Sequence, residues 1–419
     1  MQWQNTRDRN KLKEMKKVIR KTIAIIICAL ASANILSAEQ VIKNDKTMKA
    51  IDNKINRDKK INRDKKVWAW MGSVGPMTDA AADSIFAKAK ETGIDALIME
   101  VHGGNPVGML DTTDFTDYAA IAATKKAAAL AKKYGIELHI WMWIINRCEK
   151  NLQAAHRDWY QVNAEGKSCL DYNMYGVDHY RWLCPSQPQV LEYLKDRVNE
   201  IAEIDGVAGI NLDFIRYPDA ILPAGLWELR KVHQDKVYPQ WDHCYCPYCR
   251  EQYKNKRGVD PLDIQNPTED KYWMEYRYAA VVKIANALAD VIHKHHKIAS
   301  ADVFPSPDVA RKLVRQDWTK FTHLDIVFPM IYYQFYNEQA EWIITETKEG
   351  VKGLKKSGSN AYLCSGIYAD EESAPYLSTI FDYVRGAGSE GISIYDLGSA
   401  IKTPGYWEAL KTAIIKFKE

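Results

Sequence analysis

Short apolar runs alternate with amphipathic stretches from residue 67 to the end of the chain. Each run spans six to ten residues and is nearly continuous in apolar character, as is typical of strands buried on both faces of a parallel sheet. The runs lie at 67–72, 95–101, 137–145, 206–215, 297–304, 324–333, 361–369 and 391–398.

Between these runs, apolar residues recur at helical spacing. The regular alternation of strand and helix predicts parallel βαβ units, and eight such units favour a (β/α)₈ TIM barrel over an open doubly wound sheet. No G-x-G-x-x-G follows an early strand, which argues against a dinucleotide site. The amphipathic stretches are 79–92, 118–134, 189–203, 269–296, 307–320, 338–356, 375–388 and 405–418.

Two long segments interrupt this alternation. Residues 217–268 are rich in Pro and Asp and contain three of the eight cysteines, and a shorter insertion occupies 146–187. Both follow predicted strands directly, so we expect loops that cover the barrel mouth. The prediction is a single barrel over 67–419, with no second domain.

The first 66 residues differ from the rest. A basic segment precedes the apolar run "TIAIIICALASA", which ends in an A-x-A pattern at 31–33. This order predicts a secretory signal peptide within 1–38, with a retained N-terminal anchor as the alternative. Residues 39–66 read as a charged linker, because the hexamer "INRDKK" at 55–60 is repeated at 61–66. We therefore expect an exported bacterial protein, periplasmic or extracellular, whose mature form has no stable membrane span.

The charge is distributed unevenly. Residues 1–66 hold 18 Lys and Arg against 7 Asp and Glu, whereas the remainder holds 39 against 47. The near-neutral total therefore conceals an acidic folded domain, which argues against a nucleic-acid partner.

Polar and aromatic side chains gather where the predicted strands end. Barrel enzymes carry their chemistry at the carboxyl ends of the strands, so these residues are the candidates for function. Side chains alternate between the two faces of a strand, so every second residue in 137–145 and in 206–215 is expected on one face. The candidates are Glu100, His102, His139, Trp141, Trp143, Asn211, Asp213, Arg216, Asp302, Tyr332, Tyr333 and Asp396.

Three of these carboxylic acids are the expected catalytic groups. Asp213 ends the run "GINLD" and is predicted to act as a nucleophile or base. Asp302 is the leading candidate for the acid, and Glu100 is the alternative. Such a pair suits glycoside hydrolysis, in which one carboxyl group protonates the leaving oxygen and the other attacks the sugar or activates water.

The other candidates are expected to bind the carbohydrate substrate. Aromatic rings suit the apolar faces of sugars, and Asn211 and Arg216 would orient Asp213, although Arg216 would equally serve as a structural partner that keeps Asp213 ionised. No cofactor is expected. The predicted substrate-binding residues are His102, His139, Trp141, Trp143, Asn211, Arg216, Tyr332, Tyr333 and Asp396.

The segment "DHCYCPYCR" holds a cluster of possible metal ligands. His243, Cys244, Cys246 and Cys249 have a spacing that zinc sites use. Exported proteins, however, usually oxidise neighbouring cysteines. A disulfide or packed thiols is therefore the first interpretation, a structural metal the second and catalysis the third.

Three segments resemble a known family. "GVAGINLDFIRYP" (206–218), "QDWTKFTHLDIVFPMIYY" (316–333) and "HIWMWIINR" (139–147) are similar to segments of the glycosyl hydrolase-like family 10, a group of secreted bacterial barrels. The resemblance covers about 70–400. It implies a TIM barrel that acts on a polysaccharide or a peptidoglycan-like glycan, with Asp213 as the matching acid. The segment "MEVHGGNP" and Asp302 depart from the commoner pattern.

Two other functions remain open from the sequence. One is a carbohydrate-binding barrel that keeps the aromatic cleft without catalysis. The other is a metal-dependent hydrolase that uses His102, His139 and Asp213.

Overall fold

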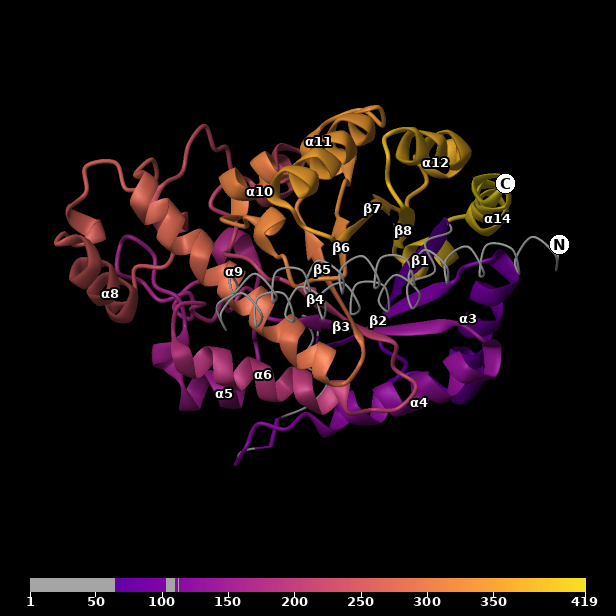
Figure 1. The fold of residues 1–419 in the computed structure, drawn as a ribbon, viewed down its shortest axis with the longest axis horizontal. Coiled ribbons are helices and arrows are strands. Elements are labelled where there is room, and N and C mark those ends of the chain that lie inside the picture. The colour runs from indigo at the N-terminus through magenta and orange to yellow at the C-terminus, as the bar shows by residue number, and fades with distance from the viewer. Residues whose placement is uncertain (1–64, 103–109, 112) are drawn as a thin grey trace, which may run out of the picture. The chain divides into compact units, whose positions relative to one another are not determined.

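The computed structural model describes residues 65–102, 110–111 and 113–419, and the description below concerns these residues. Eight parallel strands form a closed barrel in which each strand pairs with the next and the last pairs with the first (Figure 1). This arrangement confirms the predicted (β/α)₈ TIM barrel. The strands are β1 (Lys66–Met71), β2 (Ala96–His102), β3 (Glu137–Trp143), β4 (Gly209–Asp213), β5 (Ile298–Val303), β6 (Ile326–Pro329), β7 (Tyr362–Tyr368) and β8 (Gly391–Tyr395).

Helices follow the strands and surround the barrel (Figure 1). Their buried faces pack on the outer faces of the strands in one large apolar core. The helices are α3 (Asp79–Thr92), α4 (Tyr118–Tyr134), α5 (Lys150–Ala155), α6 (Pro188–Ala202), α7 (Trp227–Arg230), α8 (Pro247–Arg257), α9 (Lys271–Lys294), α10 (Pro307–Val314), α11 (Trp342–Ser357), α12 (Leu377–Gly386), α13 (Leu397–Lys402) and α14 (Tyr406–Lys418).

The helix ends follow local sequence signals. The side chain of Asp117 accepts a hydrogen bond of 2.9 Å from the backbone N–H of Ala120 and so caps the start of α4. Gly135 ends the same helix in the left-handed conformation, with φ of 59°. These signals explain why the observed bounds of α4 equal the predicted ones.

Bulky side chains fill the barrel interior. The rings of Trp68 and Trp70 lie edge-on to Phe328, with centroids 5.3 and 5.5 Å apart. Gly209 begins β4 where the interior leaves no room for a side chain, because a Cβ there would lie 2.3 Å from Nδ1 of His139. The interior is thus a packed core below the level at which a ligand enters.

Six of the eight observed strands are shorter than the predicted runs, and β6 and β8 show why. β6 ends at Pro329, and the chain continues into a short 3₁₀ turn, η7 (Tyr333–Tyr336). β8 ends at Tyr395, and Asp396 caps α13 by accepting a hydrogen bond of 2.8 Å from the N–H of Ser399. The predicted apolar runs therefore contain the strands together with the first residues of the loops that follow.

Both predicted insertions carry short helical elements. The segment after β3 contains α5, and the segment after β4 contains η3 (Ala224–Leu226), α7 and α8. In Figure 1, α8 lies apart from the ring of helices around the strands.

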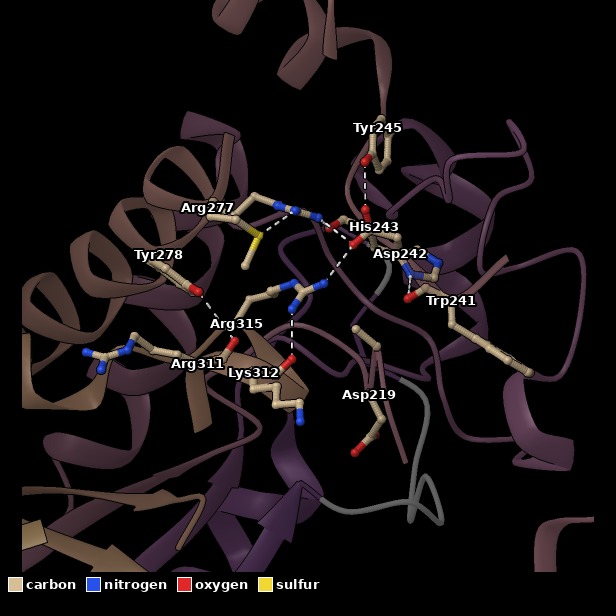
Figure 2. A network of polar contacts seen from close by, with 12 residues as sticks. Asp219, Trp241, Asp242, His243, Tyr245, Arg277, Tyr278, Arg311, Lys312 and Arg315 are labelled. Carbon is tan, nitrogen blue, oxygen red and sulfur yellow. Dashed lines mark hydrogen bonds and ion pairs between the residues drawn. The ribbon is translucent and has the colours of Figure 1, made fainter. Parts of the chain in front are cut away.

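A buried ion cluster attaches the second insertion to the barrel helices. Figure 2 shows the guanidinium groups of Arg277, in α9, and Arg315, just after α10, converging on Asp242. Their nitrogens lie 2.6 and 3.2 Å from Oδ1 of Asp242, and the Tyr245 hydroxyl donates a 2.6 Å hydrogen bond to its Oδ2. Burial alone would raise the pKa of Asp242, but Arg277 and Arg315 outweigh it and lower that pKa. Asp242 is thus held as a carboxylate.

The predicted signal peptide lies outside the described residues, as does all but the end of the predicted linker. β1 begins at Lys66, one residue inside the range predicted for the linker. None of the helices in the described part of the chain has the length and apolar character that a bilayer crossing needs.

Candidate active site

Asp213 lies at the carboxyl end of β4 and is held by two donors. The indole N–H of Trp141 donates a hydrogen bond of 2.9 Å to its Oδ2, and the backbone N–H of Phe214 donates one of 2.5 Å to its Oδ1. Phe214 adopts a left-handed conformation, with φ of 48°, at the point where the chain leaves the strand. The carboxyl group is only 7% exposed. Its orientation is therefore fixed by the strand ends around it.

Asp302 lies on the neighbouring strand at the same level. Leu212 pairs with Ala301 in the register of β4 and β5, so the next residues of the two strands, Asp213 and Asp302, are adjacent. The amide of Asn211 donates a hydrogen bond of 3.0 Å to Oδ1 of Asp302. Asn211 and Asp213 share one face of β4, so this face carries one acid and contacts the other, Asp302.

The two buried acids differ in what surrounds them. Burial raises the pKa of Asp213, whereas the Phe214 N–H, the charge of Arg216 and the Trp141 N–H oppose this rise by stabilising the carboxylate. Burial also raises the pKa of Asp302, and the negative charge of Asp213 raises it further, with Asn211 opposing. Asp213 therefore ionises first, and Asp302 retains its proton.

Glu100, on β2, is a third acid close to this pair. It pairs with Trp141 in the register of β2 and β3. Burial, then the charges of Asp213 and Asp396, raise the pKa of Glu100 to about 7. Glu100 can therefore exchange a proton near neutral pH.

A cavity of about 430 Å³ opens at this end of the barrel. Its volume lies within the range of about 300–1,000 Å³ that is usual for ligand sites. Both Asp213 and Asp302 line it. The other lining residues are Trp141, Trp143, His179, Tyr180, Phe214, Arg216, Asp219, Leu222, Pro223, Leu226, Arg230, Phe304, Met330, Tyr332, Phe335, Tyr336 and Tyr395.

Aromatic rings form much of the cavity wall. The ring of Trp143 packs against Phe214 with centroids 4.4 Å apart, and Tyr332 stacks on Tyr395 at 5.5 Å. Tyr395 also meets the edge of Trp141, with a centroid distance of 5.9 Å. The rings support one another, so the wall is rigid and largely apolar.

Arg216 has a structural position as well as a place in the cavity wall. Its guanidinium lies 3.3 Å from Oδ2 of Asp219, and the rings of Trp182, Phe214 and Phe304 surround it at 4.9 to 5.0 Å. The cation therefore stays fixed near Asp213, as expected of a residue that keeps this acid ionised.

Four of the predicted substrate-binding residues do not line the cavity. Asn211 is buried and donates its hydrogen bond to Asp302. His139 is deep in the barrel interior, where its Nε2 lies 2.8 Å from Oε1 of Glu137. Tyr333 packs into the outer apolar core. Asp396 caps α13, although its charge still reaches Glu100. The side chain of His102 lies outside the described part of the structure.

The cavity contains residues that sequence reasoning did not single out. His179, Tyr180, Leu222 and Arg230 come from the two insertions, where no periodic pattern marks a residue as facing a ligand. Alternation could have identified Tyr395, because it lies two residues after Ser393 and so shares the inward face of the run 391–398.

The cysteine cluster has a different composition from the predicted one. Cys184, from the first insertion, joins Cys244, Cys246 and Cys249, and their sulfur atoms all lie within 4.8 Å of one another. His243 faces elsewhere, with Nε2 3.1 Å from the Tyr172 hydroxyl. Cys184, Cys244, Cys246 and Cys249 form no disulfide with one another or with another described cysteine.

Three solved structures of glycosidases resemble the chain in fold at low sequence identity. The catalytic domain of β-amylase from Paenibacillus polymyxa has a TM-score of 0.58 at 12% identity, over 85% of this chain and 99% of that one. The β-galactosidase from the psychrophilic Marinomonas ef1 has a TM-score of 0.58 at 10% identity, over 84% of this chain and 59% of that one. The endo-1,4-β-mannanase from Rhizomucor miehei has a TM-score of 0.54 at 6% identity, over 84% of this chain and 94% of that one. At these identities the likeness shows the fold alone.

The sequence comparisons identify the family of the chain. No curated protein matches the chain in sequence. A family model described as "Putative glycosyl hydrolase domain" matches residues 69–385. That range contains all three acids and both insertions, while the more specific resemblance to the family 10 group stays a prediction. The chain belongs to this glycosyl hydrolase domain family.

Proposed function

We propose that the protein hydrolyses glycosidic bonds with Asp213 and Asp302 as its pair of catalytic residues. The observation that carries the proposal is that both acids line one aromatic cavity and are close enough for the charge of one to raise the pKa of the other. Retaining and inverting glycosidases both use two carboxyl groups that flank the bond to be broken.

The surroundings of each acid assign its role. Asp213 receives two hydrogen bonds and faces the Arg216 cation, so it is the ionised member that attacks the anomeric carbon or activates water. Asp302 is buried beside that charge and keeps a proton, which it donates to the leaving oxygen. Acids held in opposite protonation states by their environments are the usual arrangement for this chemistry.

Glu100 is the second candidate for the acid. Its pKa of about 7 leaves it half protonated at neutral pH, and the charge of Asp213 contributes to that value. Asp302 is preferred because it lies in the cavity wall. The two assignments differ in which variant loses the activity.

The proposed substrate is a polysaccharide or a cell-wall or host glycan. Trp141, Trp143, Tyr332 and Tyr395 offer broad ring surfaces at the cavity, and such surfaces suit the apolar faces of sugar rings. Arg230, exposed at the rim, adds a cation beside these rings.

The test is hydrolysis of a panel of polysaccharides and aryl glycosides by the wild-type protein and by three variants. Asp213→Asn and Asp302→Asn are each expected to lower kcat by about 10²–10⁴-fold, the range for loss of an acid or base. Asp260→Asn is the control, because Asp260 pairs with Arg250 in the second insertion. If Asp213→Asn keeps full activity on the true substrate, the assignment is wrong.

The Glu100→Gln variant separates the two candidates for the acid. Aryl glycosides with good leaving groups need little protonation, so a variant that lacks the acid should keep activity on them and lose it on natural sugars. We expect this pattern for Asp302→Asn. The same pattern in Glu100→Gln, with Asp302→Asn unaffected, would move the role to Glu100.

The two other functions predict different results. Glycan binding without turnover across the panel would favour a carbohydrate-binding barrel. The metal-dependent alternative uses His139, whose Nε2 is engaged by Glu137 inside the barrel. Activity that is lost to a chelator and restored by zinc would support that alternative and contradict the carboxylate pair.

We also propose that the protein is exported to the periplasm or beyond the cell. The support is the order of basic segment, apolar run and A-x-A pattern before residue 34. N-terminal sequencing of the protein from a fractionated bacterial culture tests this, and an intact N-terminus on protein found in the cytosol would contradict it.

A further inference from the structure

Four buried cysteines from two insertions meet at one point. Cys184 comes from the segment after β3, whereas Cys244, Cys246 and Cys249 come from the segment after β4. Each of the four side chains is at most 1% exposed. The sulfur atoms of all four lie within 4.8 Å of one another. Residues so far apart in sequence converge on one point only when the fold holds them there.

The spacing of the sulfur atoms fits a tetrahedral metal site. The Cys184 sulfur lies 3.3 Å from that of Cys249 and 3.7 Å from that of Cys246. Ligands of a tetrahedral zinc ion with Zn–S bonds of about 2.3 Å are about 3.8 Å apart. A disulfide requires about 2.05 Å. The observed distances therefore agree with sulfurs that share an ion.

The sequence and the surroundings agree with this geometry. Cys246 and Cys249 have the C-x₂-C spacing of structural zinc sites. Cys246 occupies the N-cap position of α8, whose dipole favours negative charge at that end. The buried hydroxyl of Tyr217, beside these cysteines, has no hydrogen-bond partner among the described residues. A metal-bound thiolate would accept that hydrogen bond.

We propose that Cys184, Cys244, Cys246 and Cys249 bind one Zn²⁺ ion as a structural site. Four thiolates fill the coordination shell of zinc and leave no position for water or substrate, so the ion has no part in the reaction. This site replaces the predicted set, in which His243 was the fourth ligand. It is independent of the proposed function.

The ion would join the two insertions that form the cavity wall. His179 and Tyr180 lie five and four residues before Cys184, and they line the cavity together with Leu222 and Arg230 from the other insertion. The ion cluster around Asp242 lies next to this site in the sequence and attaches the same insertion to α9 and α10 (Figure 2). Zinc would therefore fix the separation of the two halves of the wall.

The test is the metal content of the purified full-length protein. We expect about one zinc ion per chain, released when a mercurial reagent titrates four thiols. Cobalt(II) exchanged into the site should give a thiolate-to-cobalt charge-transfer band and the visible bands of tetrahedral coordination. Mass spectrometry after alkylation without reductant would count the free thiols.

Two variants make the test specific. Cys249→Ser is expected to lose most of the bound zinc and the cobalt spectrum, while Cys169→Ser keeps both. Cys169 is the matched control, because it is a buried cysteine of the first insertion whose sulfur accepts a hydrogen bond from Trp182 instead of joining the cluster. Measurements on the wild-type protein stand even if a variant fails to fold.

Three results would overturn the proposal. The first is a wild-type protein in which these four cysteines form disulfides, the outcome that export favours. The second is reduced protein that binds no added Zn²⁺. The third is a Cys249→Ser variant with an unchanged cobalt spectrum.

Discussion

The indole nitrogen of Trp141, on β3, donates a hydrogen bond of 2.9 Å to Oδ2 of Asp213 at the end of β4. The bond stabilises the ionised carboxylate and so opposes the rise in pKa that burial causes. A neighbouring strand thus tunes the acid that the proposed mechanism needs in its charged form.

Replacing Trp141 by Phe keeps an aromatic ring and removes this hydrogen bond. We expect the pKa of Asp213 to rise, so the acidic limb of the pH dependence of kcat/KM moves to higher pH. Because a hydrogen bond to a charged group is worth about 1.5–3 kcal/mol, kcat/KM should fall by about tenfold to a hundredfold at a pH on that limb. Trp143→Phe is the control, since the indole nitrogen of Trp143 has no partner among the described residues. Equal shifts in both variants would contradict the role of the bond.

Glu100→Gln is expected to change how stability depends on pH. The pKa of Glu100 is about 7 in the folded protein and about 4.3 when unfolded. The stability that this group contributes is full below about pH 4.3 and is lost as pH rises through 7. The variant does not undergo that loss. The melting temperature of the variant minus that of wild type should therefore be larger at pH 8 than at pH 5, by about 2 °C or more.

Glu137→Gln is the matched control for this measurement. Burial would raise the pKa of Glu137, but His139 and Lys66 outweigh it and lower that pKa to about 2. Its contribution is therefore present above about pH 4.3 and is lost only below it, as pH falls toward 2. The effect of Glu137→Gln should be the same at pH 5 and pH 8. If the melting-temperature difference between Glu100→Gln and wild type is also the same at pH 5 and pH 8, the pKa of Glu100 is not raised.

Asp242→Asn is expected to lower the free energy of unfolding by about 3–5 kcal/mol, because it leaves two buried arginines without their counter-charge. Asp260→Asn removes an ion pair with the half-exposed Arg250 in the same insertion and should cost no more than about 1 kcal/mol. Chemical denaturation measures both. Similar values for the two variants would mean that the buried cluster adds no special stability.

Gly225→Ala is expected to raise KM more than it lowers kcat. A Cβ at Gly225 would lie 2.3 Å from the carbonyl oxygen of Gln334, so η3 must move away from η7. Leu226 and Phe335, on either side of this contact, both line the cavity. Gly386→Ala, at the end of α12 where nothing lies within 4 Å, should leave both constants unchanged. Steady-state kinetics on an active glycoside compares them, and an unchanged KM in Gly225→Ala would show that η3 does not shape the cavity.

The sequence pattern predicted the barrel because each apolar run overlaps a strand and each amphipathic stretch overlaps a helix. It predicted the depth of individual residues less well. Alternation places His139 and Trp141 on one face of β3, yet it does not say that His139 lies in the packed interior below the cavity. Tyr333 was expected at the end of the strand in 324–333, but β6 ends at Pro329 and Tyr333 begins the turn η7.

The contacts between distant segments were beyond sequence reasoning. Cys184 and Cys249 are 65 residues apart and meet only because two insertions fold over the same end of the barrel. The adjacency of Asp213 and Asp302 likewise depends on the register of β4 and β5, which closure of the barrel determines. A pattern along the chain reports which face a residue takes, whereas the barrel decides which residues become neighbours.

The proposed acids and the cavity wall have separate origins in the chain. Asp213 and Asp302 are fixed by strand register, while His179, Tyr180, Leu222 and Arg230 belong to insertions that join the strands to the helices. An insertion can lengthen, shorten or exchange residues without shifting the register of the strands below it. The same barrel can therefore acquire a new specificity by changing its loops, with its reactive groups left in place.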